Sequence, residues 1–277
     1  MRITFLVDNL PHPTLPLLTE HGLSMYIDQI TPNSSLLTPN SILCDMGASG
    51  AYIKNAKALG IDLDTCHWAF LSHGHADHTG GLGKWIAQYG HIPVYASHRI
   101  ATDEYFSSRP KRVESRKSKV ESQCKVSAEA SLLDYAEPQP DFMSEANKVE
   151  SQRFNDSAIQ PERSENDPFL HEIALCFVTP KGLVIVSCCS HHGALNTIAS
   201  CMEFTGCNTL HAYIGGLHFV DSPEVEAETT SFIGDWLTLY PNAYLYTGHC
   251  TCPRAAAMLK AHLPHCHTFY TGNVVEV

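Results

Sequence analysis

The hydrophobic pattern of the first hundred residues alternates between short apolar runs and segments with helical spacing. The segments 50–59 and 80–89 are amphipathic, and Gly60 follows the first of them as a helix-ending residue. Runs of β-branched, aromatic and aliphatic residues between turn signals are typical of strands. Such runs predict strands at 1–8, 23–30, 41–47, 67–72 and 91–96.

The same alternation returns after residue 171. The turn at 180–182 joins two apolar runs, which predicts a hairpin. The predicted strands of this part are 172–178, 183–188, 210–214, 243–246 and 268–270, and the predicted helices are 194–205, 223–240 and 253–262. Strands and helices that alternate along a chain are typical of layered α/β proteins.

Residues 107–166 break this pattern. They are rich in Ser, Glu, Lys, Gln and Asn, and the pentapeptide Lys-Val-Glu-Ser-Gln occurs at both 119–123 and 148–152. A segment with so few apolar residues buries little surface, so we predict a flexible or weakly helical insertion. Two interpretations stay open: a tolerated surface insertion, or a lid over an active site.

Composition narrows the functional classes. The 277 residues are 44% hydrophobic, which suits one large or two small globular domains. The formal charge of 18 − 29 = −11 disfavours binding to nucleic acids or anionic membranes. The chain has 11 cysteines, no apolar run of about 20 residues and no signal-peptide pattern. We therefore expect a cytoplasmic protein with reduced thiols.

The strongest chemical signal is a cluster of metal-binding side chains between a predicted strand and a predicted helix. His73, His75, Asp77 and His78 fall within six residues, in a chain that has 17 histidines. Imidazole and carboxylate groups suit zinc, manganese or iron. Alternate residues of an extended turn point the same way, so the side chains of His73 and His75 can face the same side of the turn. The nearby glycines let the backbone approach an ion closely.

The residues 73–78 resemble the signature of the metallo-β-lactamase superfamily. Further motifs resemble its dihydropteroate-synthase-like branch, the 7,8-dihydropterin-6-yl-methyl-4-(β-D-ribofuranosyl)aminobenzene 5′-phosphate synthases. These motifs are 7–9, 20–24, 45–47, 55–63, 189–191, 214–218 and 248–251. The resemblance covers nearly all of the chain apart from 107–166. It implies a single domain over 1–277, an α/β fold built as an αβ/βα sandwich of two mixed β-sheets flanked by helices.

The same resemblance implies a dinuclear metal site, with zinc expected and manganese or iron as alternatives. The implied ligands are His73 and His75 for one ion, Asp77 and His78 for the other, and His191 and His249 to complete the two sites. Two metals about 3.5–4 Å apart share and acidify a hydroxide. Many members of the superfamily have a bridging aspartate after a late strand. The comparable stretch 186–191 has none, so the bridge is water alone or His191 has another role.

The sequence gives weaker indications of function for several other polar residues. Asp77 and His218 are the predicted catalytic residues, since Asp77 lies in the signature and His218 ends a Gly-Gly-Leu-His turn. Asp45 is expected to orient the metal-binding histidines through hydrogen bonds, with a turn-capping role as the alternative. Cys250 and Cys252 are expected to be buried thiols or thiols behind the metal ligands, with binding of a soft metal by the Cys-x-Cys pair as the alternative. The C-terminal histidines at 262, 265 and 267 are interpreted as surface or structural residues.

Three functions are compatible with these residues. The first is a metallo-hydrolase that uses a metal-bound hydroxide on a phosphoester or a related small molecule. The second is a transferase that joins a pterin diphosphate to an arylamine, as the branch implies. The third is a metal-binding module without catalysis. The expected partner is a small, phosphorylated molecule, without nucleic acid or membrane, and the oligomeric state stays open.

Overall fold

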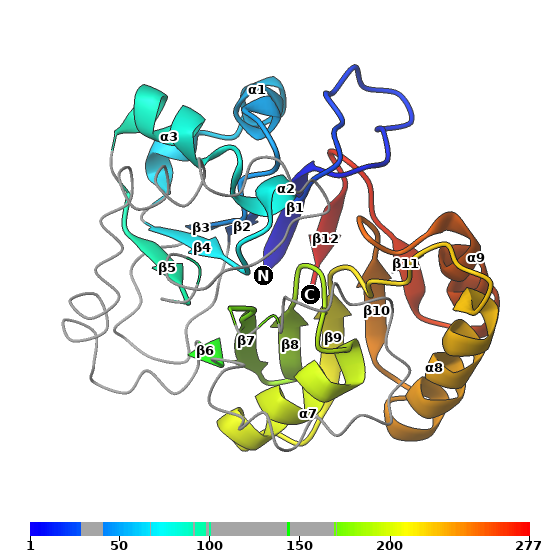
Figure 1. Cartoon of the computed structure of the whole chain (residues 1–277). Coiled ribbons are helices and arrows are strands. Elements are labelled where there is room, and N and C mark those ends of the chain that lie inside the picture. Colours follow the sequence, from blue (N-terminus) through cyan, green and yellow to red (C-terminus); the bar gives the residue numbers. More distant parts are fainter. Residues whose placement is uncertain are drawn as a thin grey trace. The chain divides into compact units, whose positions relative to one another are not determined.

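A computed structural model describes residues 1–28, 41–66, 68–90, 92–97, 100, 143–144, 169 and 171–277. The chain divides into two compact units (Figure 1). The first unit contains the N-terminal part of the chain, His171 and the last eight residues from Tyr270, and the second contains Glu172–Phe269. The predicted insertion at 107–166 lies outside the described residues, apart from the two-residue strand β6 (Met143–Ser144).

The first unit is built on a six-stranded mixed sheet. Its order is β12 (Val274–Glu276), β1 (Arg2–Val7), β2 (Ser24–Asp28), β3 (Ser41–Cys44), β4 (Trp68–Leu71) and β5 (Val94–Ala96). The pairs from β12 to β3 are antiparallel, whereas β3, β4 and β5 are parallel. The parallel strands require crossover connections, which the helices of this unit supply.

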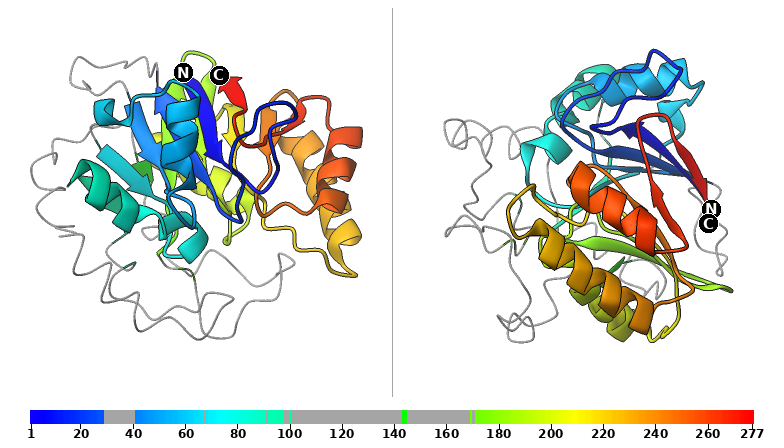
Figure 2. Two further views of the ribbon diagram at one scale, coloured as in Figure 1. Left: turned by 90° about the horizontal axis from the view of Figure 1, so that it is seen from above. Right: turned by 90° about the vertical axis from the view of Figure 1, so that its right-hand side faces the viewer.

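Helices α1 (Ala51–Ala58) and α3 (Leu82–Tyr89) bury their apolar stripes in the core of this unit. Tyr52 and Trp85 are almost completely buried there, against residues of β3 and β4. Figure 2 shows both helices beside the first sheet. The short helices η1 (Leu63–Thr65) and α2 (Ala76–Thr79) complete the unit.

Asn55 connects helix α1 to the loop after β1. Its buried Nδ2 donates hydrogen bonds of 2.7 Å to the carbonyl oxygens of Leu6 and Leu18, and its Oδ1 accepts from the backbone N–H of Leu18. One buried amide side chain therefore satisfies three backbone groups, of which the carbonyl oxygen of Leu6 is buried. This contact gives a structural reason for asparagine in the motif 55–63.

The second unit holds another six-stranded mixed sheet. Its order is β11 (Cys266–Thr268), β10 (Tyr244–Thr247), β9 (Leu210–Ile214), β8 (Gly182–Val186), β7 (Ala174–Thr179) and β6. Helices α7 (Ala194–Thr205), α8 (Val225–Leu239) and α9 (Pro253–His262) share its main core (Figures 1 and 2). Trp236 and Ile198 are central to this core. The two mixed sheets with flanking helices confirm the predicted fold class.

Most predicted elements lie at their expected positions, and two differ. The helix expected at 80–89 is α3, which begins later, at Leu82, because Gly80 and Gly81 separate it from the short helix α2. A Cβ on Gly81 would lie 2.0 Å from the carbonyl oxygen of Met46, so the chain packs against another loop there. The strand expected at 268–270 is instead β11, and β12 was not predicted. Among the described residues, no helix is long and apolar enough to cross a membrane.

Candidate metal centre

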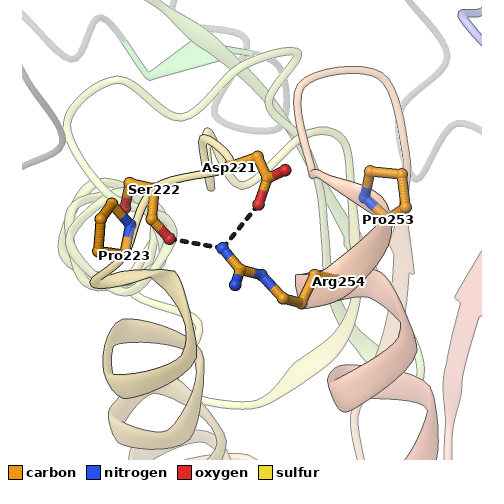
Figure 3. Close-up of a pocket in the computed structure, with 5 residues that line it drawn as sticks. All are labelled: Asp221, Ser222, Pro223, Pro253 and Arg254. Atoms are coloured by element: carbon orange, nitrogen blue, oxygen red, sulfur yellow. Dashed lines mark hydrogen bonds and ion pairs between the residues drawn. The ribbon is translucent and has the colours of Figure 1, made fainter.

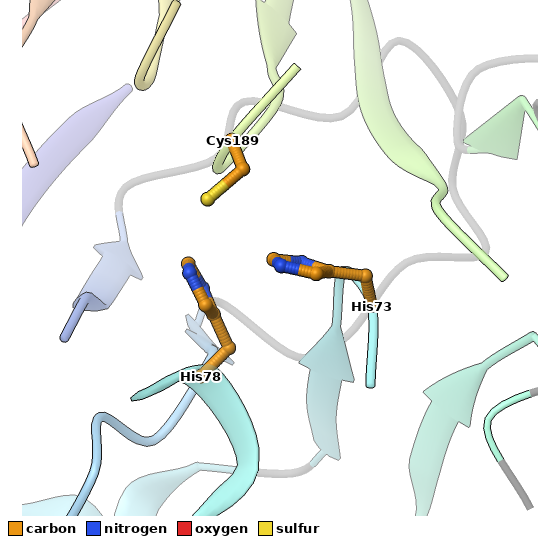
Figure 4. A group of neighbouring side chains, drawn as sticks. All are labelled: His73, His78 and Cys189. Carbon is orange, nitrogen blue, oxygen red and sulfur yellow. The ribbon is translucent and has the colours of Figure 1, made fainter. Parts of the chain in front are cut away.

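The signature histidines of the first unit lie together at the end of β4. His73 follows this strand, and His78 lies in α2, so the chain turns sharply between them. The ring centroids of His73 and His78 are 4.2 Å apart (Figure 4). Those of His73 and His75 are 4.7 Å apart. His73 and His78 are fully buried, so the fold holds two imidazoles where water has little access. The structure brings these three predicted ligands together.

A buried carboxylate orients two of these rings. Asp45 Oδ2 lies 2.6 Å from His78 Nδ1 and accepts a 2.7 Å hydrogen bond from Ser72 Oγ. Ser72 Oγ also lies 2.8 Å from His73 Nδ1. Because an ionised carboxylate only accepts, both rings are assigned the tautomer with hydrogen on Nδ1. In that tautomer Nε2 has the lone pair that a metal ion needs, which fits the predicted role of Asp45.

Asp77 lies beside the same rings. Its Oδ2 is 3.6 Å from His78 Nε2 and 3.3 Å from His21 Nε2, and its side chain is 21% exposed. This carboxylate is therefore accessible from the surface next to the buried imidazoles. A hard oxygen ligand beside imidazole nitrogens suits zinc, manganese or iron.

His171 belongs to this cluster, although its sequence context contains no motif. Its ring is nearly parallel to that of His73, with centroids 6.2 Å apart, and its Nδ1 accepts a hydrogen bond from the backbone N–H of Gly74. Phe169 packs edge-on against His75. A lone histidine after a low-complexity segment has no spacing that would identify it. Only the fold brings it back to the signature loop.

In the second unit, a buried carboxylate holds the turn that contains His191. The two oxygens of Glu172 accept hydrogen bonds from the backbone N–H groups of His191 and His192, at 2.9 and 3.0 Å. Ser190 Oγ donates to the carbonyl oxygen of Gly216 and lies 2.5 Å from the hydroxyl of Tyr213. The turn after β8 is therefore fixed from both sides.

Tyr213 takes part in this network as a neutral phenol. Burial is the largest effect on its hydroxyl and raises its pKa well above the ordinary value, because the phenolate would lose its hydration. A protonated hydroxyl can both donate and accept a hydrogen bond, which suits its position beside Ser190.

Replacement of Glu172 with alanine is expected to destabilise the protein by about 2–3 kcal/mol, because the buried N–H of His191 and the half-buried N–H of His192 lose their acceptor. The Glu172→Gln variant retains one carbonyl acceptor and is expected to lose less. Denaturant unfolding of both variants measures the difference. Equal stability of the alanine variant and the wild type would show that water replaces the carboxylate at no cost.

The remaining predicted site residues lie near the turn that contains His191. The ring centroids of His191 and His218 are 4.2 Å apart, so the structure brings these two predicted site residues together. The ligand atoms of His249, Cys189 and Cys250 lie within 4.8 Å of one another. These contacts group the candidate residues of the second unit in the loops after its strands.

Backbone strain is concentrated at these positions. Among the described residues, positive φ angles outside glycine occur at Asp45, Phe169, Ser190, His218 and His249, between 47° and 62°. A side chain in this region costs free energy, which persists where the surrounding fold enforces it. Asp45, His218 and His249 are predicted site residues. Ser190 directly precedes His191, and Phe169 packs against His75. The strain supports a functional role for these loops.

A pocket of about 560 Å³ lies elsewhere in the second unit, between the N-terminal ends of α8 and α9 (Figure 3). It is lined by Asp221, Ser222, Pro223, Pro253 and Arg254. The guanidinium of Arg254 already donates hydrogen bonds to the carboxylate of Asp221 and the carbonyl oxygen of Ser222. This arginine is therefore neutralised by its own neighbours, which disfavours a phosphate-binding role for it.

The donor set fits a metal ion by its chemistry. Within the first unit, two buried imidazoles have Nδ1 tied to Asp45 or Ser72 and Nε2 assigned the lone pair, and a carboxylate lies beside them. An oriented imidazole whose other nitrogen donates to an acidic group is the usual arrangement of a metal ligand in proteins. The imidazole, thiol and carboxylate clusters are therefore suited to divalent ions.

Comparison with solved structures decides the fold. The crystal structure of Tm1679, a metal-dependent hydrolase of the β-lactamase superfamily, is similar with a TM-score of 0.71 and 23% identity, covering 100% of this chain and 99% of that chain. This chain has the metallo-β-lactamase fold. The short form of human tRNase Z is similar at a TM-score of 0.52 and 12% identity, covering 100% of this chain and 99% of the other.

Sequence comparisons agree with the metallo-β-lactamase fold. The family profile described as the metallo-β-lactamase superfamily matches residues 33–163. A 7,8-dihydropterin-6-methyl-4-(β-D-ribofuranosyl)-aminobenzene-5′-phosphate synthase from Methanocaldococcus jannaschii is 29% identical over 259 residues, which are 88% of this chain and 85% of the relative. The predicted resemblance to the superfamily and to its synthase branch is confirmed.

Proposed function

We propose that the protein is a metal-dependent enzyme that acts on a small phosphorylated molecule, with hydrolysis as its first candidate reaction. The observation that carries this proposal is the buried array in which Asp45 and Ser72 orient His73 and His78. Burying a carboxylate and two imidazoles costs free energy that a purely structural role does not require. The similarity to a metal-dependent hydrolase supports the same reading.

The proposed ligands are the six side chains that the sequence motifs identify. They are His73, His75, Asp77, His78, His191 and His249. Bound divalent ions, with zinc proposed first, would polarise a phosphoryl oxygen and lower the pKa of a water molecule. Their positive charge would also attract an anionic substrate to a chain with a formal charge of −11.

The protein's own side chains would hold and move the proton. Asp77 Oδ2, which is partly exposed and lies 3.3 Å from His21 Nε2, is proposed as the acceptor of the proton from the attacking water. His21 is positioned to stabilise that carboxylate and to pass the proton to solvent. His218, whose ring contacts that of His191, is proposed to face the substrate.

A transferase is the second candidate, and the synthase relative is the observation that favours it. In that reaction the arylamine nitrogen would form a bond to the methylene carbon of a pterin diphosphate. The carbon–oxygen bond would break, diphosphate would leave with the electron pair, and the amine would release a proton. The two candidates therefore differ in the acceptor, which is water in one and an arylamine in the other.

Metal content and turnover, measured together, test the proposal. Elemental mass spectrometry of the purified full-length protein is expected to find about two metal ions per chain. Metal-dependent hydrolysis of bis-p-nitrophenyl phosphate would support the hydrolase. Bound metal without hydrolysis, together with condensation of a pterin diphosphate and an arylamine, would support the transferase. Failure to bind metal after reconstitution would contradict both, and bound metal without either reaction would leave a metal-binding module.

A further inference from the structure

The second unit contains a sulfur-rich donor set whose two cysteines are not among the proposed ligands. The Sγ atoms of Cys189 and Cys250 and a ring nitrogen of His249 all lie within 4.8 Å of one another. Cys189 and His249 are 3% and 6% exposed, and Cys250 is partly buried. Cys189 follows β8, whereas His249 and Cys250 follow β10, so two loops distant in sequence contribute to the cluster.

Backbone contacts hold the two thiols near each other. Cys250 Sγ donates a weak 3.5 Å hydrogen bond to the carbonyl oxygen of Cys189. A Cβ on Gly216 would lie 2.2 Å from Cys250 Sγ, so a residue without a side chain is required for the thiol to occupy this place. The positive φ of His249, 47°, is a further sign that this loop is held in a strained conformation.

The spacing of these atoms suits one tetrahedral ion. With zinc–sulfur and zinc–nitrogen bonds of about 2.3 and 2.0 Å, two ligand atoms of a tetrahedral site lie about 3.5–3.8 Å apart. The three side chains are within 4.8 Å before any ion is bound, so small rotations close the site. Two thiolates with one imidazole leave the fourth position open, which is the arrangement of catalytic rather than structural zinc sites.

We propose that Cys189, His249 and Cys250 bind one thiophilic divalent cation, of which zinc is the physiological candidate. The inference rests on the proposed function in one respect, since it shares His249 with the proposed metal ligands. It changes the expected metal preference, because soft thiolates favour zinc, cobalt and cadmium over magnesium and manganese. It also supplies negatively charged ligands in a unit whose stretch 186–191 lacks aspartate.

The absorption spectrum of bound cobalt(II) distinguishes sulfur ligands from nitrogen and oxygen ligands. Thiolate bound to cobalt gives an intense charge-transfer absorption in the near ultraviolet, whereas imidazole and carboxylate give only the weak visible bands. The metal-free full-length protein, titrated with cobalt(II), is expected to show this charge-transfer absorption. Cys189→Ser and Cys250→Ser are each expected to lose about half of its intensity, because one of two thiolate ligands is removed.

Cys207→Ser is the matched control, since Cys207 belongs to the same unit, and its Sγ contacts the carbonyl oxygen of Thr209 instead of the cluster. This variant is expected to retain the full absorption. X-ray absorption spectroscopy of the zinc-loaded wild type is expected to detect sulfur scatterers. This measurement needs no variant, so it decides the question even if a buried cysteine substitution unfolds the protein.

The outcomes separate this inference from the proposed function. Visible cobalt bands without charge transfer, or zinc without sulfur scatterers, would overturn the thiolate ligands and leave the histidine and aspartate ligands intact. Undiminished charge transfer in both folded cysteine variants would also overturn the assignment. Charge transfer without phosphoester hydrolysis would retain the sulfur site and count against the hydrolase.

Discussion

The His75→Ala variant is expected to lose bound metal and to have turnover lower by at least about 100-fold, while the fold persists. A ligand that contacts the ion should matter at least as much as the groups behind it, whose removal costs about 10–100-fold in metal affinity or activity. His75 precedes α2, and its side chain makes no capping hydrogen bond to that helix. The helix therefore does not depend on the imidazole.

Elemental mass spectrometry, turnover and thermal unfolding of the metal-free protein check this expectation together. His262→Ala is the matched control, because His262 lies at the exposed end of α9 and its Nδ1 contacts only a carbonyl oxygen of its own helix among the hydrogen bonds observed. The control is expected to retain metal and activity. Full activity in folded His75→Ala protein would refute the catalytic assignment of the signature loop.

The Asp45→Ala variant is expected to lower the free energy of unfolding by about 3–5 kcal/mol. The carboxylate accepts hydrogen bonds from the backbone N–H and the hydroxyl of Ser72 and contacts His78 Nδ1, and all of these groups are buried. Alanine would leave three buried donors without their acceptor, and each such loss costs about 1–3 kcal/mol unless the groups rearrange. Denaturant unfolding of the metal-free protein measures this effect.

The Asp45→Asn variant separates orientation of the histidines from stability. Asparagine tolerates the φ of 54° at this position and keeps a carbonyl acceptor for the N–H of Ser72. Its amide, however, would place N–H groups where Ser72 Oγ and His78 Nδ1 need an acceptor. His78 Nδ1 would then accept, and Nε2 would have the hydrogen and no lone pair for a metal.

Metal affinity of the Asp45→Asn protein is therefore expected to fall by about 10–100-fold, with a smaller loss of stability than in the alanine variant. Isothermal titration with zinc and denaturant unfolding give the two quantities separately. Unchanged zinc affinity in the asparagine variant would mean that Asp45 serves the turn after β3 and not the histidines. This is the turn-capping alternative that the sequence alone leaves open.

The sequence by itself determined those features that depend only on residues close together in the chain. The spacing of His73, His75, Asp77 and His78 places them in one short segment, from the end of β4 to α2, and no distant contact is needed for that. Helix α7 (Ala194–Thr205) and strand β9 (Leu210–Ile214) lie at their predicted bounds. Their apolar periodicity and the Gly206 helix end are properties of neighbouring residues.

The tertiary structure decided what depends on residues far apart in the chain. Asp45 meets Ser72 and His78 across 27 and 33 residues, and β12 is a strand because it pairs with β1 from the other end of the chain. His171 and Glu172 follow a low-complexity segment and have no spacing signal, yet one packs beside His73 and the other holds the turn of His191. Strand pairing and buried hydrogen bonds depend on which segments the fold brings together, and a local pattern does not contain that information.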